Sequence, residues 1–245
     1  DEPVDLHEVE QLLKRFAELP LGESQVSPNI AVGIRVQLIS TFISDNLFYI
    51  GVAKNYITMR DVAALMNRFV GKYGQRSRVG GKSAGMVLAN RILRPVFGEP
   101  TGLEDRIAEV ESYYLTAQVF NRFIEHNRLQ EGHSLKYMEP AEREQAQGEL
   151  TRRFERGTFP AEIVDVLRAM LEELGDGPLI VRSSSLLEDS MGFPFYGKYE
   201  SVFLSNRGET SERLHELVQA VKHVYASILA TSVIEYRKDK ALLDY

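Results

Sequence analysis

The stretch Leu179-Ile-Val-Arg-Ser-Ser-Ser185 places an arginine and three hydroxyl groups directly after a short apolar run. The run Pro178-Leu-Ile-Val181 is brief and partly β-branched, which predicts a short buried strand. This strand would present Arg182 and the serines at its end, where the chain has to turn. A planar guanidinium suits the oxygens of a phosphate, and serine hydroxyls add hydrogen-bond donors. Ser185-Leu-Leu-Glu188 fits a helix-capping box equally well, so part of the pattern has a purely structural explanation.

A pair of glycines precedes an expected helix in the motif Gly80-Gly81-Lys82-Ser83. Glycine lets the main chain approach an anion closely, and a helix N-terminus supplies backbone N–H groups and a favourable dipole. A Walker A loop is excluded, because Arg76 stands where its first glycine is required and no apolar strand leads into the motif. Taken alone, the motif is weak and is equally compatible with a simple turn.

A basic stretch surrounds these glycines in a chain whose formal net charge is −6. From Val62 through Gly98 there is no acidic residue. The stretch carries seven basic residues: Arg68, Lys72, Arg76, Arg78, Lys82, Arg91 and Arg94. Concentrated positive potential favours a polyanion, and the acidity of the whole chain argues against nucleic acid as that partner. A solvated basic helix face, or a docking surface for an acidic protein, accounts for the charge equally well.

The composition is that of an ordinary globular chain, with 245 residues, 44% hydrophobic and 26% charged. The absence of cysteine excludes disulfides, zinc–thiolate sites, iron–sulfur clusters and cysteine nucleophiles. No apolar run approaches the ~18 residues of a membrane span, and no signal peptide opens the chain. We therefore expect a cytoplasmic protein without a membrane or nucleic-acid partner.

The periodicity of apolar residues predicts a mainly helical region over residues 1–75 and an α+β region over 76–245. Thr58-Met-Arg-Asp61 fits a capping box, followed by a helix over 62–70, and residues 213–236 are expected to form one long helix. The chain starts without Met and stops inside an apparently helical run. We therefore expect it to be a fragment of a longer polypeptide.

Four motifs occur in the order seen in phosphoenolpyruvate synthase and pyruvate, phosphate dikinase. They are Gly80-Gly-Lys-Ser-Ala-Gly85, Glu111-Ser-Tyr-Tyr-Leu-Thr116, Val181-Arg-Ser-Ser-Ser-Leu-Leu-Glu-Asp189 and Tyr196-Gly-Lys-Tyr-Glu-Ser-Val-Phe203. Together with the expected helix over residues 218–237, they resemble the N-terminal nucleotide-binding domain of that family across about residues 78 to 240. The resemblance implies the N-terminal part of an ATP-grasp-like domain, preceded by an extra helical region.

The resemblance also implies roles for individual residues. Lys82 and Arg182 would contact the phosphates of ATP or AMP. The remaining nucleotide-binding residues would be Gly80, Gly81, Ser83, Thr116 and Glu188. The ligands of Mg²⁺ in this family lie further along the polypeptide, so no catalytic or metal-binding residue is expected within these 245 residues.

The implied activity is that of a phosphotransferase, a dikinase, in which ATP phosphorylates a histidine outside this chain and the phosphoryl group then passes to pyruvate. Pyruvate and the remaining domains of the same polypeptide would be the further partners, and this chain alone is expected to be inactive. Relatives that use a glucan or a rifamycin as acceptor leave the acceptor open. A non-catalytic nucleotide sensor or a protein-docking module is the alternative function.

Overall fold

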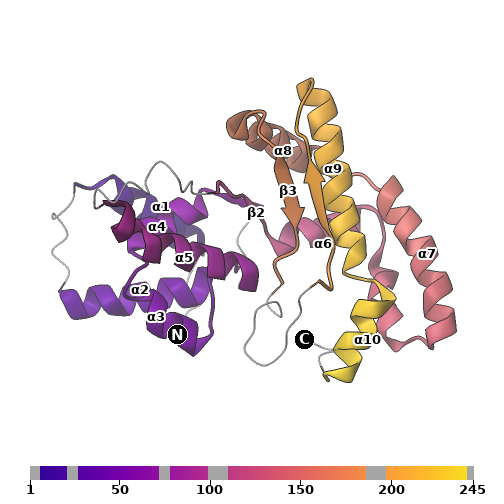
Figure 1. Ribbon diagram of the computed structural model, residues 1–245, viewed down its shortest axis with the longest axis horizontal. Helices are drawn as coiled ribbons and strands as arrows, with labels where there is room; N and C mark the ends of the chain where they lie inside the picture. Colours follow the sequence, from indigo (N-terminus) through magenta and orange to yellow (C-terminus); the bar gives the residue numbers. More distant parts are fainter. Residues whose placement is uncertain (1–5, 21–26, 72–77, 99–109, 186–196, 242–245) are drawn as a thin grey trace. The chain divides into compact units, whose positions relative to one another are not determined.

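The computed structural model describes residues 6–20, 27–71, 78–98, 110–185 and 197–241. The chain forms two compact units, Asp1–Gln118 with Ser184–Ser190, and Val119–Ser183 with Met191–Tyr245 (Figure 1). Helices predominate and two small sheets accompany them, which confirms the α+β class. The domain boundary predicted at residue 75 falls inside the first unit and stays a prediction.

The first unit consists of helices beside a small parallel sheet. Its elements are α1 (Leu6–Glu18), α2 (Pro28–Phe42), α3 (Leu47–Ala53), α4 (Met59–Met66), β1 (Phe69–Val70), α5 (Gly81–Gly98) and β2 (Tyr114–Leu115). The predicted capping box is confirmed, since the side chains of Thr58 and Asp61 and their backbone N–H groups pair reciprocally at the start of α4. The core includes Val79 and Ala84, which flank the glycine motif. The motif is therefore anchored by packing on both sides.

The helix predicted over 62–70 is wrong at its C-terminal end. Helix α4 ends at Met66, and Phe69–Val70 form strand β1, which pairs in parallel with β2. The Tyr114 N–H donates to the carbonyl of Arg68 at 2.9 Å, and the Thr116 N–H to that of Val70 at 3.0 Å. The strand depends on this distant partner, which local periodicity does not reveal.

The second unit packs helices on an antiparallel pair of strands. Its elements are α6 (Ala117–His126), the 3₁₀ helix η1 (Gln130–Tyr137), α7 (Pro140–Arg156), α8 (Ala161–Leu174), β3 (Leu179–Arg182), β4 (Ser201–Leu204), α9 (Thr210–Ser227) and α10 (Thr231–Asp239). The predicted strand before Arg182 is confirmed as β3, but the prediction that this strand is buried is wrong. Ile180 and Arg182 are exposed and Leu179 and Val181 are half-buried, because the strand pairs only with β4 in a two-stranded sheet. An aromatic cluster forms the core: the Phe123 ring lies 4.7 Å from the Phe159 ring and 5.5 Å from the Phe154 ring, centroid to centroid. Helix α9 packs on α7, α8 and both strands.

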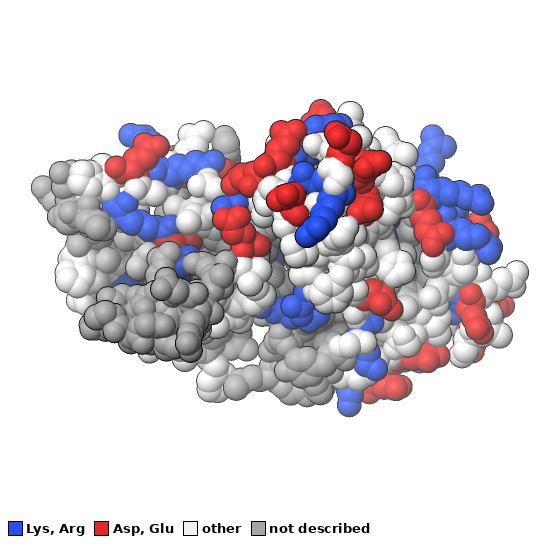
Figure 2. Space-filling view, turned by 45° about the horizontal axis from the view of Figure 1, so that its top comes forward, with Lys and Arg blue, Asp and Glu red and all other residues white. Residues whose placement is uncertain are grey.

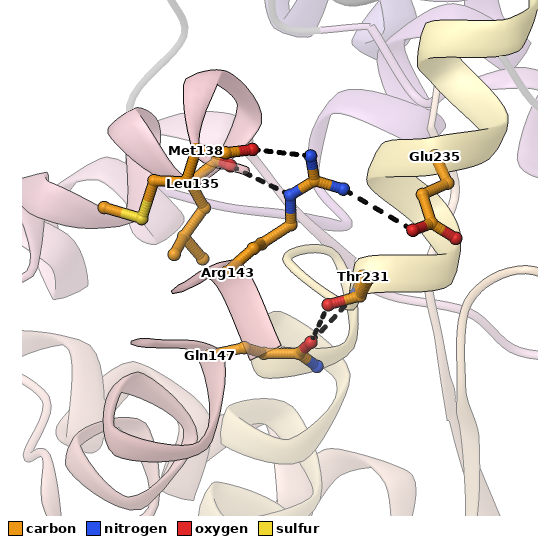
Figure 3. Close-up of polar contacts among 6 residues, drawn as sticks. All are labelled: Leu135, Met138, Arg143, Gln147, Thr231 and Glu235. Atoms are coloured by element: carbon orange, nitrogen blue, oxygen red, sulfur yellow. Dashed lines mark hydrogen bonds and ion pairs between the residues drawn. The ribbon is translucent and has the colours of Figure 1, made fainter. Parts of the chain in front are cut away.

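The single helix predicted over 213–236 is also wrong, because α9 ends at Ser227 and α10 begins at Thr231. No glycine or proline marks the break. The Gln147 side chain on α7 accepts hydrogen bonds from the Thr231 N–H at 2.9 Å and from its hydroxyl at 2.5 Å (Figure 3). A side chain 84 positions away thus caps α10 in place of a local signal.

Within the described residues, one stretch is long and apolar enough to cross a membrane by length and composition, Thr210–Asp239. Half of its most apolar window is buried inside the unit. The packing of α9 against two helices and both strands accounts for that apolar character as part of the core.

The Tyr225 hydroxyl is buried on α9 and finds no hydrogen-bond partner among the described residues. Burial raises the pKa of this phenol above its ordinary value of 10.0. The unfolded chain releases this proton near pH 10, whereas the folded chain holds it to a higher pH. The free energy of unfolding is therefore unaffected by this group below pH 10 and falls as the pH rises further. We expect Tyr225→Phe to unfold at the same or a higher denaturant concentration at pH 7 and to show a smaller stability loss above pH 10. A loss of stability at pH 7 would show that the hydroxyl is bonded.

Candidate functional site

The segment before α5 is tied to the helical core of the first unit. The Val79 N–H donates to the Phe42 carbonyl at 3.3 Å, and the Arg78 guanidinium donates to the Ser40 carbonyl at 2.9 Å. Arg78 also forms an ion pair with Asp45 at 2.9 Å. These contacts hold the chain that enters the glycine motif.

Gly80 sits where only glycine fits. Its φ is +77°, and a Cβ added there would lie 1.7 Å from the carbonyl oxygen of Ser184. The next residue, Gly81, donates its N–H to the Ser185 carbonyl at 3.1 Å. The two sequence motifs therefore touch through their main chains, and the absence of a side chain at Gly80 permits that approach.

A pair of serines continues the contact into the first turn of α5. The Ser184 hydroxyl oxygen accepts the Ser83 N–H at 3.1 Å and lies 2.9 Å from the Ser83 hydroxyl. These residues are separated by 101 positions in the sequence. Ser184 thus acts as a remote cap for the N-terminus of α5, where a helix begins with unsatisfied N–H groups and a positive dipole end. Lys82 lies in this same turn, half-buried.

Tyr49 supports the same turn, although nothing in the sequence pattern pointed to it. Its hydroxyl donates to the Ala84 carbonyl at 2.8 Å. Burial, and then the nearby Tyr114, raise the pKa of the Tyr49 phenol, so it remains a neutral donor. Local sequence patterns do not reveal this contact, because Tyr49 belongs to helix α3 and meets α5 only in the folded unit.

Thr116 directly follows strand β2 and is 4% exposed. Its N–H is bonded to Val70, but its hydroxyl has no hydrogen-bond partner within the described part of the chain. A buried hydroxyl without a partner costs stability. It is therefore a polar group suited to a ligand.

We expect Thr116→Val to keep or raise the unfolding free energy, by up to about 1 kcal/mol, because the shape is preserved and the unpaired hydroxyl is removed. Chemical denaturation of the parent and the variant would measure this. The matched change Thr41→Val removes a hydroxyl that donates to the Gln37 carbonyl at 2.8 Å, and it should not stabilise. A clear destabilisation by Thr116→Val would show that its hydroxyl is bonded inside the protein.

Arg182 lies in the second unit, at the end of β3, and is exposed. Its side chain has no ion pair or hydrogen bond with any described residue. Glu188 lies outside the described residues. Of the predicted site residues, Gly80, Gly81 and Ser83 lie together, and they contact Ser184 and Ser185.

The basic stretch is partly neutralised by acidic residues from outside it. Arg91 pairs with Asp61 at 3.0 Å, Arg68 approaches Glu111 at 3.9 Å, and Arg78 pairs with Asp45. Figure 2 shows acidic and basic side chains interspersed over the described surface in view. The positive potential around the basic stretch is therefore weaker than the number of basic residues predicts. Lys82 lies in the first turn of α5.

No group of three or more His, Asp or Glu residues within the described ranges is arranged to hold a metal ion.

The glycine loop at the N-terminus of α5 contacts the Ser184 hydroxyl and the Ser185 carbonyl of a distant segment in a domain of the α+β class. Residues 76–245 match the sequence profile of the pyruvate phosphate dikinase AMP/ATP-binding domain, and the chain belongs to this family. The family and the nucleotide-binding domain implied by the four motifs are thereby confirmed. Comparisons with curated proteins and with solved structures give no match.

Proposed function

We propose that the chain is the ATP-binding portion of a phosphoenolpyruvate synthase-like phosphotransferase of the cytoplasm. In the complete enzyme, ATP phosphorylates a histidine outside this chain, and that histidine passes the phosphoryl group to pyruvate. The observation that carries the proposal is the contact of the Gly80–Ser83 motif with Ser184 and Ser185 in a chain of the AMP/ATP-binding family.

The residues of the proposed site bind and orient the nucleotide. Lys82 supplies a positive charge at the positive end of the α5 dipole, and both favour phosphate oxygens. Arg182 supplies a planar fork for a second set of oxygens. The Thr116 hydroxyl is a further donor for the nucleotide. None of these groups transfers the phosphoryl group, so we expect no ATP turnover by this chain alone.

Thermal unfolding with and without ATP tests the proposed site. ATP at about one hundred times its dissociation constant should stabilise the parent chain by roughly 2.7 kcal/mol. Lys82→Ala and Arg182→Ala should each lose most of this gain, because each removes one charged contact with the phosphates. Lys54→Ala, which removes a lysine at the C-cap of α3, is the matched control and should keep the full shift.

The absence of a shift at millimolar ATP, both in this chain and in a longer polypeptide that contains it, would overturn the proposal. A shift that Lys82→Ala and Arg182→Ala both retain would place the nucleotide elsewhere. In the longer polypeptide, ATP binding without transfer of the phosphoryl group to a histidine would favour the nucleotide sensor over the enzyme.

A further inference from the structure

Helix α3 presents an apolar outer face to solvent. Leu47 is 82% exposed and Phe48 is 75% exposed, and Val52, one turn further along, is exposed on the same side. Tyr56 is exposed in the turn that follows the helix. Ile50, on the opposite side of α3, is buried in the core of the first unit. The helix is therefore apolar on the side that faces solvent as well as on the side that packs.

The first half of α2 is exposed in the same way. Ile30 is 58% exposed, and Val32 and Ile34 are exposed as well. The residues that α2 buries belong to its second half, from Leu38 to Phe42. A helix that is apolar around its whole circumference is normally buried on all sides, so the first half of α2 lacks the cover that its composition predicts. Helices α2 and α3 pack on each other, and Figure 1 shows both at the lower edge of the first unit.

The exposed apolar side chains of the described residues are concentrated in this region. Almost half of the large ones lie between residues 30 and 56, and we call these seven side chains the α2–α3 surface. At their exposures they present on the order of 600 Å² in total. The largest apolar patch of a typical monomer spans about 300–600 Å², and each partner in a stable interface contributes about 800 Å². With a polar rim, the α2–α3 surface is large enough for a stable protein interface.

The two segments that form the α2–α3 surface are uncharged and sterically open. Neither residues 27–34 nor residues 46–53 include a charged side chain, although the chain has a net charge of −6. Two copies of the chain can therefore meet through these segments without bringing like charges together. Gly33 and Gly51 are exposed on the two helices, and a Cβ added at either would meet nothing within 4 Å. The backbone of each helix is thus open to close approach by another helix.

We propose that the α2–α3 surface is the contact between two copies of this chain. In a twofold pair the same surface of each copy packs on that of the other, so the surface has to be self-complementary, and an uncharged apolar surface satisfies this condition. Leu47 and Phe48 of each copy are buried by the other copy. The surface precedes the residues that match the AMP/ATP-binding domain, so the inference does not rest on the proposed function.

Sedimentation equilibrium of the parent chain over about 1–100 µM should show a dimer that dissociates on dilution. Phe48→Glu should weaken the dimer at least about thirtyfold, because it places a charge in the apolar contact and the twofold axis repeats the change. Phe203→Glu is the matched control, since Phe203 is 80% exposed on β4 of the second unit, and it should leave the dimer unchanged. Because both side chains are largely exposed, both variants are expected to fold, and circular dichroism would verify this.

Phe48→Trp supplies a direct signal from the contact, because the chain contains no tryptophan. Its fluorescence should shift to shorter wavelength as the protein concentration rises through the range of dimer formation, since the ring then leaves water. Phe203→Trp is the control and should show no such shift.

A parent chain that stays monomeric up to about 100 µM would overturn the inference. A dimer that Phe48→Glu leaves intact, or in which the emission of Phe48→Trp does not change, would also overturn it, because the contact would then lie elsewhere. A monomer that binds phospholipid vesicles and loses this binding in Phe48→Glu would overturn it in favour of a membrane contact. The proposed function is tested separately, by the ATP-dependent stabilisation that Lys82→Ala should lose.

Discussion

Replacing Gly80 with alanine is expected to destabilise the first unit by roughly 2–6 kcal/mol and to abolish ATP-dependent stabilisation. Gly80 has a φ of +77°, a region that costs an L-residue about 1–3 kcal/mol. The new Cβ would also lie 1.7 Å from the carbonyl oxygen of Ser184, so one of the two main chains has to move. Overpacking of that kind typically adds about 1–3 kcal/mol. The displacement would also break the Ser83–Ser184 contact that caps α5.

Two other glycines separate the cost of the positive φ from the cost of the close contact with Ser184. Gly197 also has a positive φ, +66°, but a Cβ there would meet nothing within 4 Å. Gly197→Ala should therefore lower the free energy of unfolding only by the cost of the positive φ. Gly85, exposed on α5, is also unobstructed, and Gly85→Ala should stabilise the helix by about 0.5–1 kcal/mol. Chemical denaturation followed by circular dichroism would measure all three. If Gly80→Ala were as stable as the parent, the close approach to Ser184 would be disproved.

Truncation of Arg143 to alanine is expected to destabilise the second unit by about 3–5 kcal/mol. Arg143 is 1% exposed on α7, and its guanidinium donates to the carbonyls of Leu135 at 3.2 Å and Met138 at 2.8 Å (Figure 3). It also lies 3.7 Å from the Glu235 carboxylate on α10. Alanine would leave the carbonyls without donors and open a cavity, and each effect is costly in a core.

The pair Arg152–Glu149 on the same helix supplies the control. Both side chains are about 60% exposed, so Arg152→Ala should leave the denaturation midpoint unchanged within error. Glu235→Gln should cost far less than Arg143→Ala, because Glu235 is half exposed and the two carbonyl contacts survive. Arg143→Met restores the volume without the donors and should fall between the parent and alanine. Equal midpoints for Arg143→Ala and Arg152→Ala would show that the buried cation contributes nothing.

Much of the secondary structure followed from local signals. The helix expected behind Gly80 and Gly81 is α5, and the strand expected before Arg182 is β3, because both have signals within a few residues of the chain. The Thr58–Asp61 capping box was readable because its partners lie three positions apart. The order of the four motifs indicated the family, and the match of residues 76–245 to the AMP/ATP-binding domain confirms it. The roles predicted for Lys82, Arg182, Thr116 and Glu188 stay predictions.

Interactions between distant parts of the chain account for the places where the structure differs from the sequence-based predictions. The cap of α10 comes from Gln147, 84 positions away, and the end of α4 is set by the pairing of β1 with β2. The burial of Arg143 also had no local signal, since its partners belong to η1 and α10.

The sequence alone determined the class of fold, the family and the two motifs of the candidate site, because helix periodicity, capping and motif order are local or ordered along the chain. Only the tertiary structure decided that Gly80 and Ser184 touch, that Tyr49 supports α5 and that Phe48 stands exposed on α3. The physical reason is that such contacts depend on distances through space, and residues 101 positions apart meet only after the chain has packed.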